Sequence, residues 1–460
     1  MNRLLNKQEV DYVLFHLGHH CTLHDELRAR FSFESWNECG ICEIPQVHFY
    51  QSNKAMQPVS LIWLQQSVPV LFPQEGFEEW FSFDDNGHLY IRQDIIKSAF
   101  FFLSGLQEYD RTERDEHGRF LHRHSLQHAL GVGMMPVVNY YFDVLVHALS
   151  LFCQRWDIPF ERKRLFSSFG FWLSHDVDRL AYFSLRQTLK RMLQYCGIKQ
   201  RTSSRNQLKK DIVRGLAHLI FPHRFPDPWQ NILSMAEDEA KLGIRSTYFL
   251  LFRQHYMDGR VGLKPLRHRQ MIESFRRSGA EVGLHGSYAS MHDAAVLRNQ
   301  IQEFEQAAGF TPAGIRQHYL RTDISQTLAS QLDTGFQYDA TLGFADAPGY
   351  RNGYCYPFKP FDFSKQSIMD IWELPLMLME VSVLEYQQGD FEHLQLVATK
   401  LADEAEKFGG FVSLLWHNCR LREEDYPGVS SFYPNLIREM MVRNAESITG
   451  CDLVKLIRTL

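Results

Sequence analysis

The sequence predicts an α/β protein with a parallel sheet in the larger, C-terminal part of the chain. From about residue 166, short apolar runs alternate with longer amphipathic segments, as expected of strands joined by helices. A chain of 460 residues, 45% of them hydrophobic, is large enough for two domains with packed cores. Several apolar runs end in His, Asp or Arg, and ligand sites of parallel α/β folds lie beyond the carboxyl ends of the strands.

The expected elements follow from these runs. Strand, helix, strand repeated in this way predicts a sheet that is open or closed into a barrel. Residues 1–165 mix helical periodicity with short strands and are expected to form a smaller supporting domain. There, the aromatic-rich run 94–109 suits a buried helix against a sheet. Residues 166–460 are expected to form the main domain, with a helix at 297–310 and strands at 170–176, 245–252, 279–286, 314–319 and 409–417.

Composition excludes several classes of function. The net charge of −5 gives no reason to expect a nucleic-acid partner. No apolar window is long enough for a membrane helix, and charges interrupt the N-terminal apolar runs, so we expect no signal peptide and a cytoplasmic protein. The eight cysteines are scattered, which favours reduced thiols, and Cys39 and Cys42 lack the second pair of a zinc knuckle. The cluster His117, His122, His124 and His128 is expected to be solvated surface.

A basic insertion interrupts the main domain at about 186–225. Between Arg186 and Arg214 there are nine Lys or Arg residues and a single acid, Asp211. One interpretation is a solvated helical hairpin. The other is a basic lip that attracts phosphate, on a nucleotide sugar, a lipid-linked sugar or an anionic membrane surface.

The most informative segment is 169–178, where an apolar run ends in His175, Asp176, Val177 and Asp178. Alternation along a strand places Asp176 and Asp178 on one side and the other two residues opposite. Charges at the end of a buried strand are costly to desolvate, which indicates a cation, a proton-transfer task or both. Helix capping is the structural alternative, and it explains one Asp but not the pair.

Polar residues at four strand ends resemble, in chain order, the motifs of the polysaccharide deacetylase family, of the NodB-homology or carbohydrate esterase family 4 type. These segments are LSHDVD at 173–178, LHG at 284–286, GIRQHY at 314–319 and LLWHN at 414–418. The resemblance covers roughly residues 166–420. It extends to the branch of the family with an extra N-terminal domain, and it implies a distorted (β/α) barrel and a metal-dependent amide hydrolase.

The resemblance implies a divalent metal, expected to be zinc, bound by Asp178 and His285. The family's second motif normally supplies another His four residues further on, where this chain has Ala289. His318, His292 or a water are the candidates to replace that ligand. His318 is the best placed, because it ends another strand of the same sheet.

The resemblance also implies catalytic roles for three side chains and one backbone group. Asp176 would take a proton from water, and Arg316 would fix the orientation and ionised state of Asp176. His417 would protonate the leaving amine. The backbone N–H of Tyr319 would be an oxyanion donor.

An acid that orients His417 is left open between Glu373, Asp370 and Asp339. The function expected first is deacetylation of an N-acetylated sugar in cell-surface polysaccharide metabolism, on a carbohydrate that is free, phosphate-linked or lipid-linked. Two alternatives remain. One is a sugar-binding or scaffold protein of glycan assembly, motivated by Ala289, and the other is hydrolysis of a C–N bond in a substrate that is not a sugar.

Overall fold

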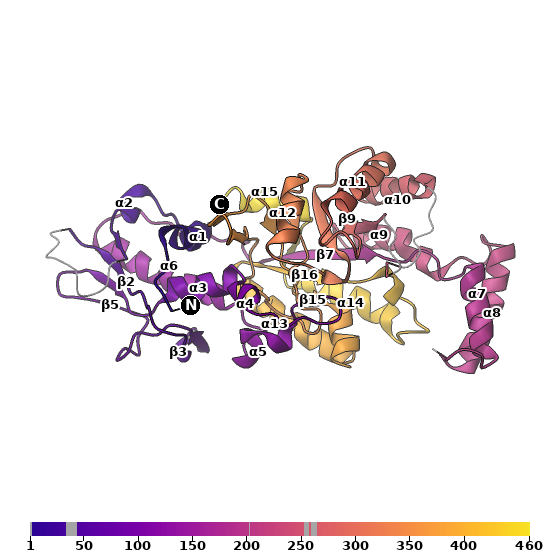
Figure 1. Cartoon of the computed structure of the whole chain (residues 1–460), viewed down its shortest axis with the longest axis horizontal. Coiled ribbons are helices and arrows are strands. Elements are labelled where there is room, and N and C mark those ends of the chain that lie inside the picture. The colour runs from indigo at the N-terminus through magenta and orange to yellow at the C-terminus, as the bar shows by residue number, and fades with distance from the viewer. Residues whose placement is uncertain (1, 34–43, 202, 253–256, 259–264) are drawn as a thin grey trace. The chain divides into compact units, whose positions relative to one another are not determined.

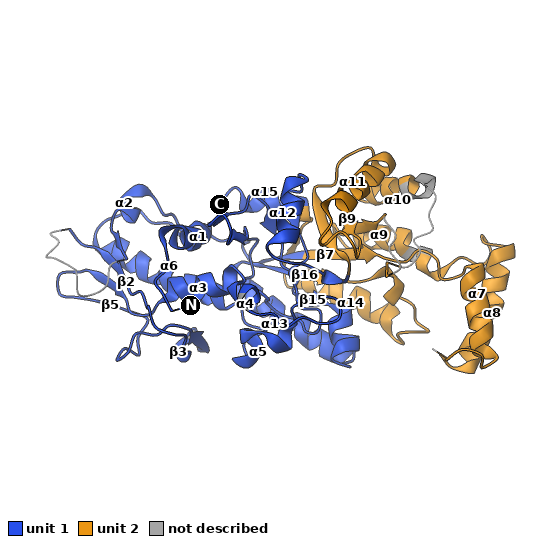
Figure 2. Cartoon of the chain, in the orientation of Figure 1, with its two compact units in different colours: residues 1–171, 319–413, 451–460 blue, residues 172–318, 414–450 orange. Residues whose placement is uncertain are grey.

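A computed structural model describes residues 2–33, 44–201, 203–252, 257–258 and 265–460 (Figure 1). Cys39 and Cys42 lie outside these residues. The chain divides into two compact units, residues 1–171, 319–413 and 451–460 (unit 1) and residues 172–318 and 414–450 (unit 2), coloured separately in Figure 2. This division differs from the expected domains 1–165 and 166–460, because unit 1 includes 319–413. The domain boundary at 165 stays a prediction.

Unit 1 begins with an α/β region, which confirms the expected fold class of the N-terminal part. Its four-stranded sheet has the order β1-β2-β6-β5, in which only β5 is antiparallel to its neighbour. The elements are α1 (Lys7–Leu17), α2 (Asp25–Arg28), β1 (Phe31–Ser32), β2 (Val47–Phe49), β3 (Val59–Trp63), β4 (Gln66–Val70), β5 (Phe81–Phe83), β6 (Leu89–Ile91), α3 (Ile95–Leu103), α4 (Leu106–Asp110), α5 (Leu126–Ala129) and α6 (Val137–Arg155).

The single helix expected at 94–109 is instead two helices, α3 and α4. Asp94 caps α3 by accepting a hydrogen bond from the Lys97 amide, and every residue of α3 is buried. The chain then turns at Gly105, whose φ of 69° is a left-handed conformation that glycine adopts without a steric penalty. The prediction of a buried aromatic helix is therefore confirmed for 95–103 and wrong beyond it.

The remainder of unit 1 contains short strands and three α-helices. β11 pairs in parallel with β14, so that Asp339 and Glu373 lie directly opposite each other. The elements are α12 (Gln326–Asp333), β11 (Tyr338–Asp339), β12 (Phe361–Asp362), β13 (Ser367–Ile368), β14 (Trp372–Glu373), β15 (Leu378–Met379), α13 (Phe391–Phe408) and α15 (Gly450–Ile457).

The strands of the parallel sheet that the pattern predicts lie mostly in unit 2, and two of them, 169–177 and 411–415, begin in unit 1. β7 (Phe169–Val177), β8 (Thr247–Leu251), β9 (Glu281–Gly286) and β10 (Gly314–Gln317) are parallel neighbours, and β16 (Phe411–Leu415) lies on the other side of β7. These pairings make a parallel sheet, so the expected α/β fold with a parallel sheet is confirmed. All nine residues of β7 are buried, which explains its uninterrupted apolar character.

Helices connect these strands. They are α7 (Leu185–Tyr195), α8 (Arg205–Ile220), α9 (Ile232–Lys241), α10 (Pro265–Arg277), α11 (Ala294–Ala308) and α14 (Val429–Val442), and the short strand β17 (Ala445–Ser447) pairs with β7. The helix expected at 297–310 is α11, which Asp293 caps at its start and Gly309 ends with a φ of 77°. The basic insertion forms the helical pair α7 and α8. No helix within the described ranges combines the length and apolarity needed to cross a membrane.

Candidate metal centre

Three side chains of unit 2 converge on one point from three parallel strands. Asp178 directly follows β7, His285 lies in β9 and His318 follows β10. The Nε2 atom of His285 lies 3.1 Å from Asp178 Oδ1, and that of His318 lies 3.7 Å from the same oxygen. One ligand atom from each residue lies within 4.8 Å of the other two, which is close enough for all three to hold a single ion.

The donor atoms that face this point are suited to binding a metal ion. Asp178 Oδ1 and His285 Nε2 are buried, and beyond their 3.1 Å contact with each other neither has a hydrogen-bond partner among the described residues. Burying such polar atoms without a partner costs free energy, and a bound cation removes that cost. Two imidazoles and a carboxylate form a donor set that suits zinc.

Both imidazoles are held from behind. His285 Nδ1 donates to the carbonyl of Arg316 at 2.8 Å, and His318 Nδ1 donates to Asp258 Oδ1 at 2.7 Å. A histidine that binds a metal through Nε2 usually donates Nδ1–H to an oxygen in this way, which fixes the ring and its tautomer. Asp258 is buried and also accepts a hydrogen bond from the Tyr288 amide at 2.8 Å.

The charges at this point perturb one another in the metal-free protein. Burial raises the pKa of Asp178, but His318 and His285 outweigh burial and hold that pKa well below its usual value. Burial lowers the pKa of His318, but the carboxylates of Asp178 and Asp258 raise it to about 9. Without a metal, His318 is therefore protonated at neutral pH.

Asp176 and Arg316 form a buried pair beside these ligands. Arg316 is fully buried in β10, and its Nη1 donates to Asp176 Oδ1 at 3.0 Å and to Ser174 Oγ at 2.9 Å. Its guanidinium also lies 4.5 Å from the centre of the Phe249 ring. Asp176 Oδ2 lies 3.7 Å from His285 Nε2, so the carboxylate is next to the candidate metal ligands.

His417 lies on the other side of Asp178. It comes two residues after β16, and its Nε2 atom lies 3.8 Å from Asp178 Oδ2. Its side chain is 14% exposed, so the ring is accessible at the edge of the site. The structure thus brings together six residues that the sequence singled out, which are Asp176, Asp178, His285, Arg316, His318 and His417.

The opposite face of β7 carries a buried polar network. His175 Nε2 lies 3.1 Å from Glu239 Oε1, and His175 Nδ1 donates to the carbonyl of Trp416 at 2.7 Å. Glu239 also accepts hydrogen bonds from Tyr248, at 2.9 Å, and from Tyr433. His175 therefore points away from the metal ligands, as strand alternation predicts.

Tyr319 belongs to unit 1, although it follows His318 directly. Its φ of 62° and that of Leu320, 54°, are left-handed conformations that non-glycine residues rarely adopt. Its carbonyl accepts from Arg119 at 3.2 Å, and its ring lies 4.7 Å from that of His117. Like His117, His122 and His124 are half-buried and His128 is exposed, so the expectation of solvated surface is wrong for three of the four histidines. The role of the Tyr319 N–H as oxyanion donor stays a prediction.

The three acids considered for orienting His417 also lie in unit 1. Glu373 and Asp339 are buried, and Glu373 accepts from the Leu342 amide at 2.9 Å. Asp370 is exposed and pairs with Lys359 at 2.6 Å. The orienting acid thus remains unassigned.

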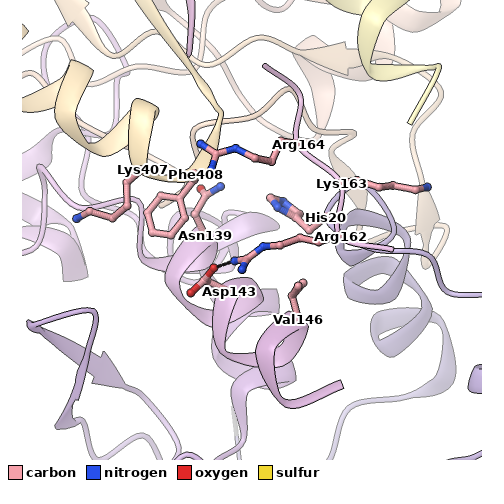
Figure 3. A pocket seen from close by; sticks show the side chains of 9 residues that line it. All are labelled: His20, Asn139, Asp143, Val146, Arg162, Lys163, Arg164, Lys407 and Phe408. Atoms are coloured by element: carbon pink, nitrogen blue, oxygen red, sulfur yellow. Dashed lines mark hydrogen bonds and ion pairs between the residues drawn. The ribbon is translucent and has the colours of Figure 1, made fainter. Parts of the chain in front are cut away.

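A pocket in unit 1 is lined by several cationic side chains and is a second candidate site (Figure 3). Arg162 is paired with Asp143, and Lys407 lies 3.0 Å from Glu404. Lys163 donates to backbone carbonyls. Because these charges already have partners, the pocket is a weaker candidate than the convergence at Asp178.

Asp258 is the residue that sequence reasoning missed. It lies between β8 and α10, in a segment without strand or helix periodicity, and it matches no motif. Ser174 could have been predicted from the sequence, because alternation along β7 places it on the same face as Asp176 and Asp178.

Residues 7–154 match a family of unknown function, DUF7033. None of the curated proteins matches the sequence. Among solved structures, a protein from Mycobacterium smegmatis described as a polysaccharide deacetylase has 18% identity and a TM-score of 0.40, over 64% of this chain and 91% of that one.

The similarity is to polysaccharide deacetylases. The peptidoglycan deacetylase PdaC from Bacillus subtilis has 10% identity and a TM-score of 0.30, over 64% of this chain and 93% of that one. A pseudoenzyme of carbohydrate esterase family 4 from Bacillus anthracis has 9% identity and a TM-score of 0.30, over 62% and 66%. The expected resemblance is confirmed as a similarity of fold.

Proposed function

We propose that this protein is a metal-dependent amide hydrolase that removes an acyl group, most simply acetyl, from an amino sugar. The observation that carries the proposal is the contact of the buried atoms Asp178 Oδ1 and His285 Nε2, which lie 3.1 Å apart without any other hydrogen-bond partner among the described residues and have His318 beside them. His318 would provide the metal ligand that Ala289 cannot. This supports a catalytic site rather than a protein that binds sugar without hydrolysing it.

The residues around the ligands suit hydrolysis of an amide. A divalent ion, which we propose to be zinc, would polarise the amide carbonyl and acidify a water. Asp176, next to the ligands, would take the proton from that water, and Arg316 would hold the Asp176 carboxylate in position. His417, at the accessible edge, would return a proton to the departing amine.

The test uses the purified full chain, its metal content and acetate release from N-acetylated mono-, oligo- and nucleotide-linked sugars. Asp176→Asn is expected to keep the metal and lose about 10²-fold or more in activity, because it removes the base. Asp178→Asn is expected to lose both the bound metal and the activity. Asp238→Asn, on the exposed face of α9, is the matched control and leaves both unchanged.

Two results would contradict the proposal. Protein without bound metal that releases no acetate across the panel would exclude a hydrolase. Sugar binding that is insensitive to chelator would favour the binding-protein alternative.

A further inference from the structure

The helices α7 and α8 of unit 2 expose an unusual apolar surface. Leu185, Leu189 and Leu193 are spaced by four along α7, and Val213, Leu216 and Ile220 are spaced by three and four along α8, so each set lies on one face of its helix. All six side chains are exposed, among them Leu185 at 61% and Ile220 at 68%. We call these six residues the outer face of the hairpin.

The side of α7 that packs against the protein is polar. Its buried residues are Thr188, Arg191 and Gln194, whereas the leucines face solvent. Surface helices of globular proteins have the opposite arrangement, with the apolar stripe toward the core. In α8 the buried residues are Leu208, Asp211 and Gly215, so this helix also leaves most of its large apolar side chains outside.

Close packing fixes this orientation. A Cβ atom at Gly215 would lie 2.7 Å from Thr188 Oγ1, so the two helices approach closely and leave no room for leucine side chains between them. They lie side by side in Figures 1 and 2. Asp211 anchors α8 through buried bonds to Arg422, at 2.5 Å, and to the hydroxyl of Tyr182, at 2.7 Å. The outer face therefore cannot turn inward without breaking these contacts.

Three lysines, unpaired within the described part of the chain, lie on the same two helices as the outer face. The exposed Lys190, Lys209 and Lys210 have no ion-pair partner among the described residues. Asp211 is the single acid between Arg186 and Arg214, and it is buried in its bond to Arg422, so it cannot neutralise the surface. Aliphatic side chains beside unpaired lysines on a helix are the combination that binds the interface of an anionic bilayer.

We propose that the outer face of the hairpin docks onto an anionic lipid membrane, with its aliphatic side chains inserted at the headgroup boundary and its lysines near the lipid phosphates. A second copy of the chain fits less well, because it would bring two sets of unpaired lysines together. Nucleic acid fits less well because aliphatic side chains offer no stacking surface for bases. The proposal concerns binding alone and does not depend on the proposed hydrolase activity.

The experiment measures cosedimentation of the full chain with vesicles. We expect binding to phosphatidylcholine vesicles with about one third phosphatidylglycerol, weakening as salt is raised, and little binding to pure phosphatidylcholine. The triple variant Leu189→Ser, Val213→Ser and Ile220→Ser is expected to weaken binding by at least about tenfold, because it removes the inserted side chains. Its matched control replaces three apolar residues exposed elsewhere, Ile62→Ser, Leu396→Ser and Val442→Ser, and is expected to bind like the wild type.

A charge variant tests the second half of the proposal. Lys190→Glu with Lys210→Glu is expected to weaken binding at least about tenfold, since each lysine near an anionic surface contributes about fivefold. The control pair Lys241→Glu and Lys455→Glu, on other helices, is expected to have little effect. Absence of vesicle binding, equal binding to both vesicle types, or a dimer that the serine triple variant dissociates would overturn the proposal.

Discussion

At the scale of single residues, Asp258 acts on the candidate metal site through another side chain. It touches no substrate in the proposed reaction, but it holds Nδ1 of His318 and so determines which way that ring faces. Its role is to position a ligand, and its effect should appear in metal affinity before it appears in stability.

We therefore expect Asp258→Asn to weaken metal affinity by about 10- to 100-fold, because the amide no longer provides the anionic acceptor for His318. Competition with a chromogenic chelator measures this affinity. Asp238→Asn, which is exposed, serves as the control and should not change it. Unchanged affinity in Asp258→Asn, with the fold intact by circular dichroism, would show that the negative charge of Asp258 is not needed to position His318 for the metal.

The titration of His318 gives a second prediction. Its pKa is raised to about 9 in the metal-free protein, so the ion must displace a proton at neutral pH. Metal affinity should accordingly rise with pH and level off above about 9, with about one proton released per ion at neutral pH. In the metal-free protein the same shift stabilises the fold at low pH, and that contribution is lost as the pH rises through about 9.

Calorimetric titration in two buffers of different ionisation enthalpy counts the released protons. His318→Gln is the comparison, because it cannot carry the proton. Equal proton release by this variant and the wild type would show that the proton comes from another group.

Much of the site could be predicted from the sequence because strand geometry determines which side chains come together. Alternation along β7 and the shared edge of parallel strands are enough to bring Asp176, Asp178 and His285 together from sequence. His318 could be chosen over His292 only by its place at a strand end. Asp258 could not be predicted, because its segment has no periodicity and its position depends on a long-range contact.

At the scale of elements, β7 separates two polar systems. One face carries Asp176 and leads to Asp178, and the other carries His175, which contacts Glu239 and the carbonyl of Trp416. Because Trp416 precedes His417, the network on the back of β7 also fixes the strand end that presents the proposed acid. Sequence patterning predicted the two faces of the strand, but it gave no sign of Glu239, which comes from α9.

The strand pair β11 and β14 of unit 1 gives a prediction about pH. Burial, and then the nearby Asp339, raise the pKa of Glu373 well above its usual value. An acid with a raised pKa in the folded state disfavours folding increasingly as the pH rises above its unfolded value. Glu373→Gln should therefore raise the melting temperature more at alkaline than at mildly acidic pH.

Thermal unfolding across a pH series checks this expectation. The glutamine can still accept the hydrogen bond from the Leu342 amide and can donate to Asp339. Asp370→Asn, three residues earlier and exposed, is the control and should leave the pH profile unchanged. A lower melting temperature of Glu373→Gln at every pH would mean that the carboxylate itself is required.

At the scale of the whole molecule, the division into two compact units could not be read from the sequence. Residues 319–413 follow the last candidate metal ligand, yet they cluster with the N-terminal segment. Local patterning identifies strands and helices, but membership of a compact unit depends on contacts between residues far apart in the chain. The parallel order of unit 2 was predictable because consecutive strands joined by helices usually become neighbours.

Metal binding should be visible in the stability of the full chain. An ion that binds only the folded state stabilises it by about 2.7 kcal/mol at a concentration one hundred times its dissociation constant. Zinc should thus raise the melting temperature by about 2–4 °C and a chelator should reverse the change. Differential scanning calorimetry of the wild type and Asp178→Asn tests this, and an equal shift in the variant would place the ion elsewhere.

The hydrogen bonds behind the two imidazoles determine the order in which the holoprotein is assembled. His285 is oriented by the Arg316 carbonyl and His318 by Asp258, so folding alone arranges both rings. The conformational entropy of ordering the ligands is then lost during folding and not during capture of the ion. The chain can fold first and take up its metal afterwards, and a protein stripped by chelator should recover the ion without passing through an unfolded state.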